Sequence, residues 1–524
     1  MLGTIALIVG IVAAFVAYWR LKYGFADKIP SVGPLVPFFG NGLEFSQKNT
    51  YQTFRNLNRI CSSEHRLVKI MFGPLPVFCP LHADFMYKVM TDSASMGKPY
   101  VYRFFRVDEG LSAQPYDLWK VHRKVLNPTF NSRILNSFIP IFTDCVDKMI
   151  KSIEKQWKPG QALNIIEFTS PCTLSMICRT SLGGKVLERE GTQEFVVGLE
   201  AILRNVGLRM FNANLHPDIV YRFTRFYRYE MEARKFCYAF TDKIIHEKRA
   251  EFAKLQNKND SNNNPNGSPK GGNKQVNKVE PEEVEDDMLS YKKPQIFIDQ
   301  LMTTPLPDGK MFTHEEITDH IYTMIAAGNE TSATQAAHTA LLLAMHPEIQ
   351  ERAMVELREV FPTRESGYNP EVLKQLVYMD RIIKESQRLA PVAAVFGRQT
   401  LSDLQLDEFV IPKGNIFILN IFALHRRKEF WGEDAEEFNP DRFLPEETKK
   451  RHPFAYLPFS AGPRGCIGSR YATMSLKTII SELLRNYKLT TDMKYQDIKF
   501  KFKVSMHLAT EHRVFLEPRN MYPD

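Results

Sequence analysis

A cysteine set among three glycines and a proline is the feature that most restricts how this chain can fold. Residues 459–468 read Phe-Ser-Ala-Gly-Pro-Arg-Gly-Cys-Ile-Gly, and the cysteine is Cys466. Glycine lets a backbone approach a flat ligand closely, and proline restricts its path, so this loop can direct several backbone N–H groups at one sulfur. A thiolate stabilised in this way is the form of cysteine that ligates metal. A helix predicted from about Ile467 would place its positive dipole end beside the same anion.

Cys466 alone favours a buried free cysteine in a glycine-rich turn. The full pattern, however, resembles the haem-binding loop Phe-x-x-Gly-x-Arg-x-Cys-x-Gly of the cytochrome P-450 family, with Phe459, Gly462, Arg464, Cys466 and Gly468 at its five fixed positions. The resemblance implies that Cys466 is the proximal thiolate ligand of a haem iron. It also implies the fold of that family, which is mainly α with a smaller β region and holds the haem between a long distal helix and the cysteine-ligand loop.

The composition fits a large enzyme domain. The chain has 524 residues, of which 44% are hydrophobic, so material for an interior is ample. Its seven cysteines are scattered, odd in number and without a Cys-x-x-Cys pair, which argues against a disulfide framework or a zinc site and favours a reducing compartment. The net charge of +8 fits a membrane surface, an acidic partner or neither, and no clustered basic motif indicates nucleic acid.

The N-terminus predicts a membrane anchor. Residues 2–19 form an uncharged apolar run, just short of the roughly 20 residues that span a bilayer comfortably, and Arg20 and Lys22 follow it. A cleaved signal peptide is the alternative, but its charged n-region and a clean cleavage site are missing. Because the cationic flank is C-terminal, the rest of the chain is expected to be cytoplasmic. We therefore expect an uncleaved anchor at 1–22, in the endoplasmic reticulum membrane by the resemblance, with the catalytic domain on the cytoplasmic face.

Three further stretches have distinctive compositions. Residues 23–45 contain recurring prolines and predict a stiff hinge before a catalytic domain at 46–524. Residues 256–293 are rich in Asn, Gly, Lys and Ser and end in acidic residues, so they predict a disordered surface insertion. Residues 215–229 mix aromatic rings with arginines, which fits a membrane interface and a solvated basic helix face about equally.

Several arginines and a tryptophan are candidates to hold the haem. Trp119 and Arg123 are four residues apart and share a helix face, which by itself could mean only an arginine stem packed on a ring. The resemblance implies that both donate hydrogen bonds to a haem propionate, and both side chains are donors only. By the same resemblance Arg398 is a second propionate-binding arginine, and Arg464 is a third candidate.

Residues 313–345 predict one long helix that starts with a capping box. Its middle, Ala-Gly-Asn-Glu-Thr-Ser at 327–332, could be only a kink with a polar patch, because a threonine can compete for the carbonyl one turn earlier. The segment also resembles the oxygen-binding motif of the family. That resemblance implies that the Thr331 hydroxyl hydrogen-bonds dioxygen and that the Glu330 carboxylate relays protons from water.

Glu385 and Arg388 are three apart on a predicted helix, and such pairs are usually surface charge pairs worth little. The segment Phe-Asn-Pro-Asp-Arg-Phe at 438–443 resembles a family segment that completes a buried network with this pair. The resemblance thus makes Glu385, Arg388 and Arg442 a structural network that locks the core near the haem.

The resemblance extends over essentially the whole chain and is closest to microsomal, family-4-like members of insect type. Two positions depart from that group. Gly465 stands where it usually has asparagine, and Ala327 stands where many members have the glutamate that is esterified to the haem. We therefore expect haem b, bound without a covalent link apart from the Cys466–iron bond. Fatty-acid ω-hydroxylation becomes a less secure expectation for the same reason.

The function that the resemblance implies is monooxygenation. One oxygen atom of O2 enters a lipophilic substrate (a fatty acid, a hormone-like lipid or a xenobiotic), with electrons from an NADPH-cytochrome reductase and cytochrome b5 as a further candidate donor. Lys120, Lys124 and Arg470 are candidate docking residues. A haem-thiolate isomerase or dehydratase of peroxides is the first alternative, against which the intact Glu330 and Thr331 argue. A non-catalytic haem-binding sensor is the second.

Overall fold

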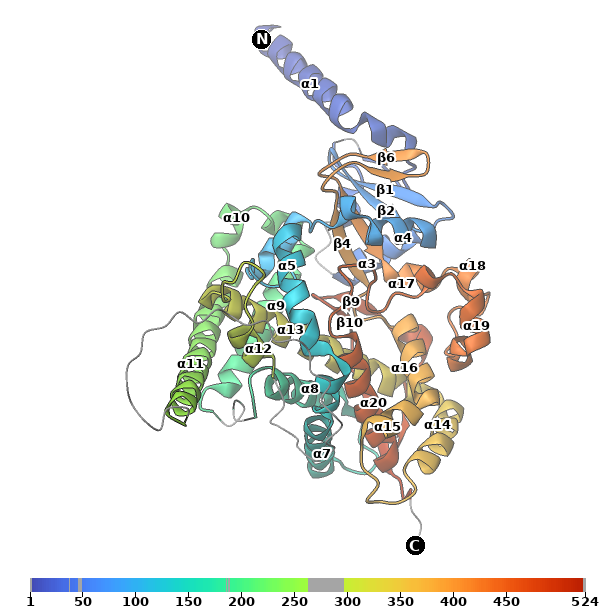
Figure 1. Cartoon of the computed structure of the whole chain (residues 1–524). Helices are drawn as coiled ribbons and strands as arrows, with labels where there is room; N and C mark the ends of the chain where they lie inside the picture. Colours follow the sequence, from blue (N-terminus) through green and yellow to red (C-terminus); the bar gives the residue numbers. More distant parts are fainter. Residues whose placement is uncertain are drawn as a thin grey trace.

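Helices make up most of this computed structural model, and the strands form four small sheets, of which the one with β1 (Leu67–Phe72) and β2 (Leu75–Pro80) lies near the end that carries α1 (Leu2–Tyr23) (Figure 1). The mainly α fold with a smaller β region agrees with the prediction. The structure describes residues 2–36, 38–45, 50–184, 186, 189–262 and 296–521.

The first helix projects away from the rest of the chain. α1 extends alone from the end at which β1, β2 and β6 (Phe409–Ile411) lie (Figure 1). A window within Gly3–Lys28 is long and apolar enough to cross a bilayer, by length and composition, and none of it is buried. This is the position at which the sequence predicts the anchor.

The proline-rich segment after α1 is hydrogen-bonded to the first strand. The backbone N–H of Lys69 in β1 (Leu67–Phe72) donates to the carbonyl of Pro30 over 2.8 Å, and the Asn41 N–H donates to Met71 over 2.7 Å. Gly40 lies against β1 with φ of 58°, and a Cβ there would come within 2.4 Å of the Met71 carbonyl. Backbone contacts therefore fix the segment, except at Pro37, which lies outside the described residues.

The main sheet has the strand order β1-β2-β7-β4. Residues 67–80 form an antiparallel pair, β1 and β2 (Leu75–Pro80), because Gly73 takes a φ of 60° and turns the chain. Residues 404–411 likewise form a hairpin that turns at Asp407. The other strands are β3 (Leu163–Asn164), β4 (Val395–Gln399), β5 (Leu404–Leu406), β6 (Phe409–Ile411), β7 (Ile416–Asn420), β8 (Tyr487–Thr490), β9 (Phe500–Phe502), β10 (Met506–Leu508) and β11 (Arg513–Pro518).

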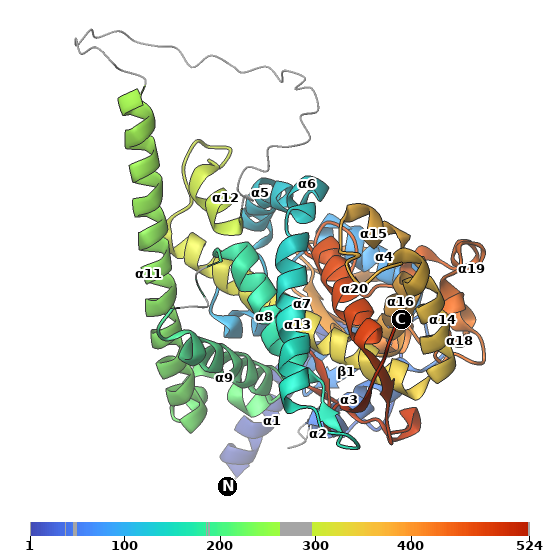
Figure 2. The same ribbon diagram turned by 90° about the horizontal axis from the view of Figure 1, so that it is seen from below.

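α13 (His314–Met345) passes through the centre of the helical part, against α8 (Ile166–Ser181) and α20 (Ser469–Asn486) (Figure 2). It starts with the predicted capping box, since the Thr313 hydroxyl accepts from the Glu316 N–H while the Glu316 carboxylate accepts from the Thr313 N–H. A Cβ on Gly328 would lie 2.7 Å from the Ile177 side chain of α8. The small residue in the motif therefore lets two helices approach closely.

The remaining helices surround these three. α11 continues to Asn262, into the stretch predicted as a disordered insertion at 256–293, and residues 263–293 lie outside the described residues. Extending an existing helix needs no new nucleation, so a polar sequence can continue it. The helices are α2 (Gly42–Phe45), α3 (Thr50–Cys61), α4 (Ala83–Thr91), α5 (Tyr116–Leu126), α6 (Ser132–Asn136), α7 (Ile139–Gln156), α9 (Thr192–Met210), α10 (Asp218–Arg222), α11 (Arg225–Asn262), α12 (Phe297–Thr303), α14 (Pro347–Val360), α15 (Pro370–Gln375), α16 (Val377–Leu389), α17 (Ile421–Leu424), α18 (Lys428–Trp431) and α19 (Pro445–Lys450).

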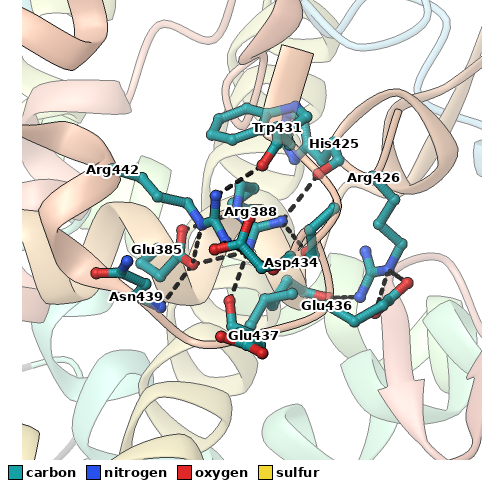
Figure 3. Close-up of polar contacts among 12 residues, drawn as sticks. Glu385, Arg388, His425, Arg426, Trp431, Asp434, Glu436, Glu437, Asn439 and Arg442 are labelled. Atoms are coloured by element: carbon teal, nitrogen blue, oxygen red, sulfur yellow. Dashed lines mark hydrogen bonds and ion pairs between the residues drawn. The ribbon is translucent and has the colours of Figure 1, made fainter. Parts of the chain in front are cut away.

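A fully buried ion pair lies on α16, and its further hydrogen bonds connect this helix to the chain that follows α18 (Figure 3). Both nitrogens Nε and Nη2 of Arg388 donate to Glu385 over 2.7 Å, and neither side chain is exposed. Arg442 approaches the same carboxylate at 3.6 Å, and the Asn439 N–H donates to it over 2.9 Å. The three-residue network predicted from the sequence is therefore present.

The rest of the Arg388 guanidinium donates to backbone carbonyls of His425, Ala435 and Glu437. One side chain thus fixes three points of an irregular segment. A buried charge is tolerated only when its donors and acceptors are engaged. Glu385 and Arg388 meet this condition, whereas Nε of Arg442 has no hydrogen-bond partner among the described residues and lies 3.6 Å from the Glu385 carboxylate.

Replacing Glu385 with alanine should lower the free energy of unfolding by roughly 3–5 kcal/mol, because the fully buried Arg388 guanidinium would lose its counter-charge. Urea unfolding of the full chain in detergent, followed by far-UV circular dichroism, measures this. Glu436→Ala is the control, since Glu436 is 63% exposed and pairs with Arg426, and should cost less than about 1 kcal/mol. Equal destabilisation by the two variants would contradict a structural role for the buried network.

Candidate active site

The loop at 459–468 has the tight path that its glycines predict. The Cys466 N–H donates to the carbonyl of Phe459 over 2.9 Å and closes the loop. Gly462 has a φ of 68°, and a Cβ there would lie 2.0 Å from the carbonyl oxygen of Met90. Only glycine fits this position, so the loop is held against the end of α4.

The Cys466 thiol is the exposed one among the seven cysteines, and the other six are buried. Desolvation by the surrounding protein raises its pKa, while the backbone N–H of Gly468 and the charge of Arg123 act in the opposite direction. α20 starts at Ser469 with Gly468 as its N-cap, so its positive end lies at the sulfur as predicted. Of the several backbone donors expected, Gly468 is the one that acts on the sulfur here. A cation bonded to the sulfur would offset the cost of the desolvated thiolate.

Three cationic side chains gather beside this loop without a carboxylate. Arg398 on β4 is 1% exposed and Arg464 is 8% exposed. Nε of Arg398, and Nε and Nη1 of Arg464, have no acceptor among the described residues. Desolvation, and then the charge of Arg398, lower the pKa of Arg464 to about 9. Desolvation likewise lowers the pKa of Lys98, with both arginines adding to the effect.

This donor set fits the haem group. Buried cations normally have an anionic partner, and a porphyrin with two propionates would supply two carboxylates to Arg398 and Arg464. The structure adds Lys98 to the set. A single lysine far from the motifs gives no sequence signal, so it was not among the predicted residues.

The helix α5 brings Trp119 and Arg123 to the same place. The Trp119 ring is buried and lies 4.5 Å from the Arg464 guanidinium. Arg123 donates to Asn127 over 2.7 Å and is close enough to influence the pKa of Cys466. The structure thus assembles the predicted cofactor-binding residues Trp119, Arg123, Arg398, Arg464 and Cys466 from α5, β4 and the loop.

Ala327 and Thr331 mark the open face of α13. Ala327 is exposed and Thr331 is partly exposed, whereas the helix is otherwise mostly buried. The Thr331 hydroxyl donates to the Ala327 carbonyl over 2.7 Å, and α13 nevertheless continues without a break. Residues four apart share one face of a helix. This face offers a methyl group and a hydroxyl to a ligand.

Glu330 points to a different neighbour. Its Oε1 accepts a hydrogen bond from the Ser505 hydroxyl over 2.8 Å and contacts Nε2 of His507 at 2.8 Å. Desolvation alone would raise the pKa of Glu330, but His507 and Ser505 together hold it below its usual value. The sequence predicted a carboxylate that exchanges protons with water and gave no indication of these partners, which are about 175 residues away.

These features together indicate a protein that binds haem through a thiolate. They are the exposed Cys466 on its glycine-rich loop, the cluster of cations without a carboxylate partner among the described residues, and the open face of α13. Residues 30–515 match the family model described as Cytochrome P450. The chain therefore belongs to the cytochrome P450 family, whose members are haem-iron monooxygenases, and the resemblance seen in the loop is confirmed.

Curated relatives extend this result. The chain is similar to Cytochrome P450 4c21 of Blattella germanica, with 30% identity over 94% of each chain. It is 28% identical to Cytochrome P450 4V2 of Mus musculus over 94% of this chain and 90% of the relative. It is 27% identical to Cytochrome P450 4c3 of Drosophila melanogaster over 95% of this chain and 90% of the relative. The predicted similarity to family-4 and insect members is borne out.

Replacing Arg398 with methionine should speed haem loss by roughly 10–100-fold, since a hydrogen bond to a charged group is worth about 1.5–3 kcal/mol. The rate of haem transfer to apomyoglobin measures this. The apoprotein should not be destabilised, because the change removes repulsion with Arg464. In the control Arg426→Met, the native arginine already donates to Leu389, Tyr495 and Glu436, so protein stability should fall without selective haem loss. Unchanged haem loss in Arg398→Met would contradict the propionate assignment.

Proposed function

We propose that this chain is a membrane-bound monooxygenase that inserts one oxygen atom of O2 into a lipophilic substrate, a fatty acid, a hormone-like lipid or a xenobiotic. The observation that carries the proposal is the intact pair of Glu330 and Thr331 on α13. This helix packs on α20, which begins directly after the loop of Cys466. An acid beside a hydroxyl is needed where dioxygen must be protonated, and neither a peroxide isomerase nor a haem sensor requires it.

The cofactor we propose is haem b, and it supplies the activation of oxygen when bound. Cys466 is its thiolate ligand, and the Phe459 carbonyl and the Gly468 N–H shape the loop around the sulfur. The alkyl side chain of Ala327 can form no ester, which supports non-covalent binding. Trp119, Arg123, Arg398 and Arg464 hold the two propionates.

Thr331 and Glu330 transfer the protons that the reaction requires. The Thr331 hydroxyl can rotate its proton from the Ala327 carbonyl toward a ligand on the open face, and its lone pairs remain available as acceptors. Glu330 carries protons to this hydroxyl from a neighbouring face of α13, since successive helix residues point about 100° apart. Substrate and oxygen therefore share one face of the helix, and the proton supply enters from another.

Residues 1–22 are proposed to anchor the chain in the endoplasmic reticulum membrane, with 23–45 as a hinge and 46–524 as the catalytic domain on the cytoplasmic face. Phe38 in the proline-rich segment is 85% exposed, and Phe223 after α10 is 87% exposed. Of the two interpretations of residues 215–229, the exposed ring favours the membrane interface.

The electron donor we propose is a membrane-bound NADPH-cytochrome reductase, with cytochrome b5 as a further donor. Lys120 and Lys124 on α5 and Arg470 on α20 are exposed. α5 also carries Trp119, and α20 begins just after Cys466. This placement suits an acidic partner that delivers electrons to the thiolate side.

The proposed function is tested with the full chain in lipid nanodiscs and a purified reductase. We expect a thiolate-type Soret band with carbon monoxide after reduction, lost in Cys466→Ala, and oxygen consumption that requires NADPH, reductase and a lipophilic substrate. Turnover of lipid peroxides without reductase would instead indicate an isomerase. A carbon-monoxide band without any substrate-dependent oxygen consumption would indicate a sensor.

Reversing the charges of Lys120 and Lys124 to glutamate should slow reduction by the reductase roughly 10-fold at low salt, and less at high salt, because steering between exposed charges is screened. Stopped-flow reduction under carbon monoxide measures the rate, and the final spectrum should not change. Lys374→Glu is the control, since Lys374 is 72% exposed on α15. A double variant reduced as fast as the wild type would place the docking surface elsewhere.

A further inference from the structure

The carboxylate of Glu330 is held by a hairpin from the far C-terminal part of the chain. Ser505 donates to its Oε1 over 2.8 Å, and Nε2 of His507 lies 2.8 Å from the same oxygen. Ser505 and His507 also contact each other at 2.9 Å. The three groups form a closed triangle of contacts of 2.8–2.9 Å.

The position of the hairpin is set by its backbone. β9 and β10 pair antiparallel, and the Lys503 N–H donates to the Ser505 carbonyl over 2.9 Å in the turn between them. The Met506 N–H donates to Val392 over 2.8 Å, which joins the hairpin to the chain after α16. His507 is therefore held at a fixed distance from α13.

Other titratable groups near the triangle do not compete for this role. Lys503 acts on Glu330 only as a distant charge. Burial lowers the pKa of His338 on α13 to about 3 and that of His512 well below its usual value. Both imidazoles are therefore neutral at physiological pH. His338 uses its Nδ1–H to donate to Ala390 over 3.2 Å, and its Nε2 has no partner among the described residues.

A purely structural partner for Glu330 would not need to be histidine. An arginine or lysine would supply a fixed charge, whereas imidazole gains and loses a proton near neutral pH. The Glu330 side chain is 17% exposed and that of His507 10%, so direct access of water to the carboxylate is restricted. A carboxylate that must be reprotonated in each turnover therefore needs a nearby donor.

We propose that His507 is this donor and reprotonates Glu330 in each catalytic cycle, an inference that rests on the proposed function of Glu330. The N–H bond at Nε2 of His507 breaks, and an O–H bond forms at Oε1 of Glu330. Glu330 passes its proton on toward the Thr331 face, and solvent water supplies a new proton to the His507 ring. Ser505 is a positioning residue, because its hydroxyl holds the carboxylate oxygen in line with the ring.

The test uses His507→Gln in the full chain with reductase. The amide keeps an N–H donor for Glu330 but exchanges no proton, so positioning and proton supply are separated. Haem content, the carbon-monoxide band and the rate of the first reduction should equal the wild type. Turnover should fall about 10–100-fold, within the range of general acid–base catalysis, with more hydrogen peroxide formed per NADPH and a larger solvent isotope effect. His507→Asn is the second variant, in case the first does not fold.

A second readout does not depend on turnover. Infrared titration identifies the protonated carboxyl band of Glu330 as the one absent in Glu330→Gln. Because His507 helps to lower the pKa of Glu330, this band should appear at higher pH in His507→Gln. The matched control is His346→Gln at the end of α13, where His346 also pairs with a glutamate, Glu348, at 3.2 Å. It should leave coupling and the band unchanged.

The outcomes separate the two hypotheses. Wild-type coupling and isotope effect in His507→Gln, together with a defect in Glu330→Gln, would overturn the role of His507 and leave the proposed function intact. Wild-type coupling in Glu330→Gln would overturn both. A defect in both His507 and Glu330 variants, with His346→Gln normal, is the result that we expect.

Discussion

Uncompensated positive charge at the ends of Arg398 and Arg464 is the constraint on which the site depends. Two buried guanidinium groups with free N–H donors repel each other and depress the pKa of Lys98. Such an arrangement costs free energy unless an anion neutralises it. The fold holds the charges in place through β4 and the Cys466 loop, so the protein is built to bind a group that brings carboxylates. Stability of the region and cofactor binding are therefore linked.

Neighbouring residues of the central helix α13 have different surroundings. Successive residues of an α-helix point about 100° apart, so residues 327–331 reach different surroundings. Gly328 lies against Ile177 of α8, Ala327 and Thr331 lie on the open face, and Glu330 contacts the C-terminal hairpin. The same short motif thus provides close packing, an open face and a buried carboxylate contact, and the proposed function assigns the last two to ligand binding and proton transfer. A shift of α13 against α8 would disturb all three at once, which explains the tight fit at Gly328.

Local sequence patterns were sufficient to predict those structural features that a single segment of the chain forms by itself. The Cys466 loop, the capping box of α13 and the Glu385–Arg388 pair are such features. The sequence did not show that 67–80 is a hairpin, because the positive φ of Gly73 decides it, nor that α11 continues to Asn262. It did not show that Lys98 joins the buried arginines or that Ser505 and His507 contact Glu330, because these are tertiary contacts with distant motifs. The candidate haem-binding residues that lie in family motifs could be predicted from the sequence. The residues that tertiary packing brings next to them could not.

In the proposed function, electrons and protons reach the site from different elements. The exposed basic residues belong to α5 and α20, beside Cys466, whereas the proton contacts run from the hairpin of β9 and β10 through His507 to Glu330. In the proposed relay, Glu330 passes a proton to Thr331, the next residue on α13, and delivery depends on these two side chains rather than on open access of water. The contact between His507 and Glu330 thus gives the β9–β10 hairpin a proposed chemical role beside the central helix.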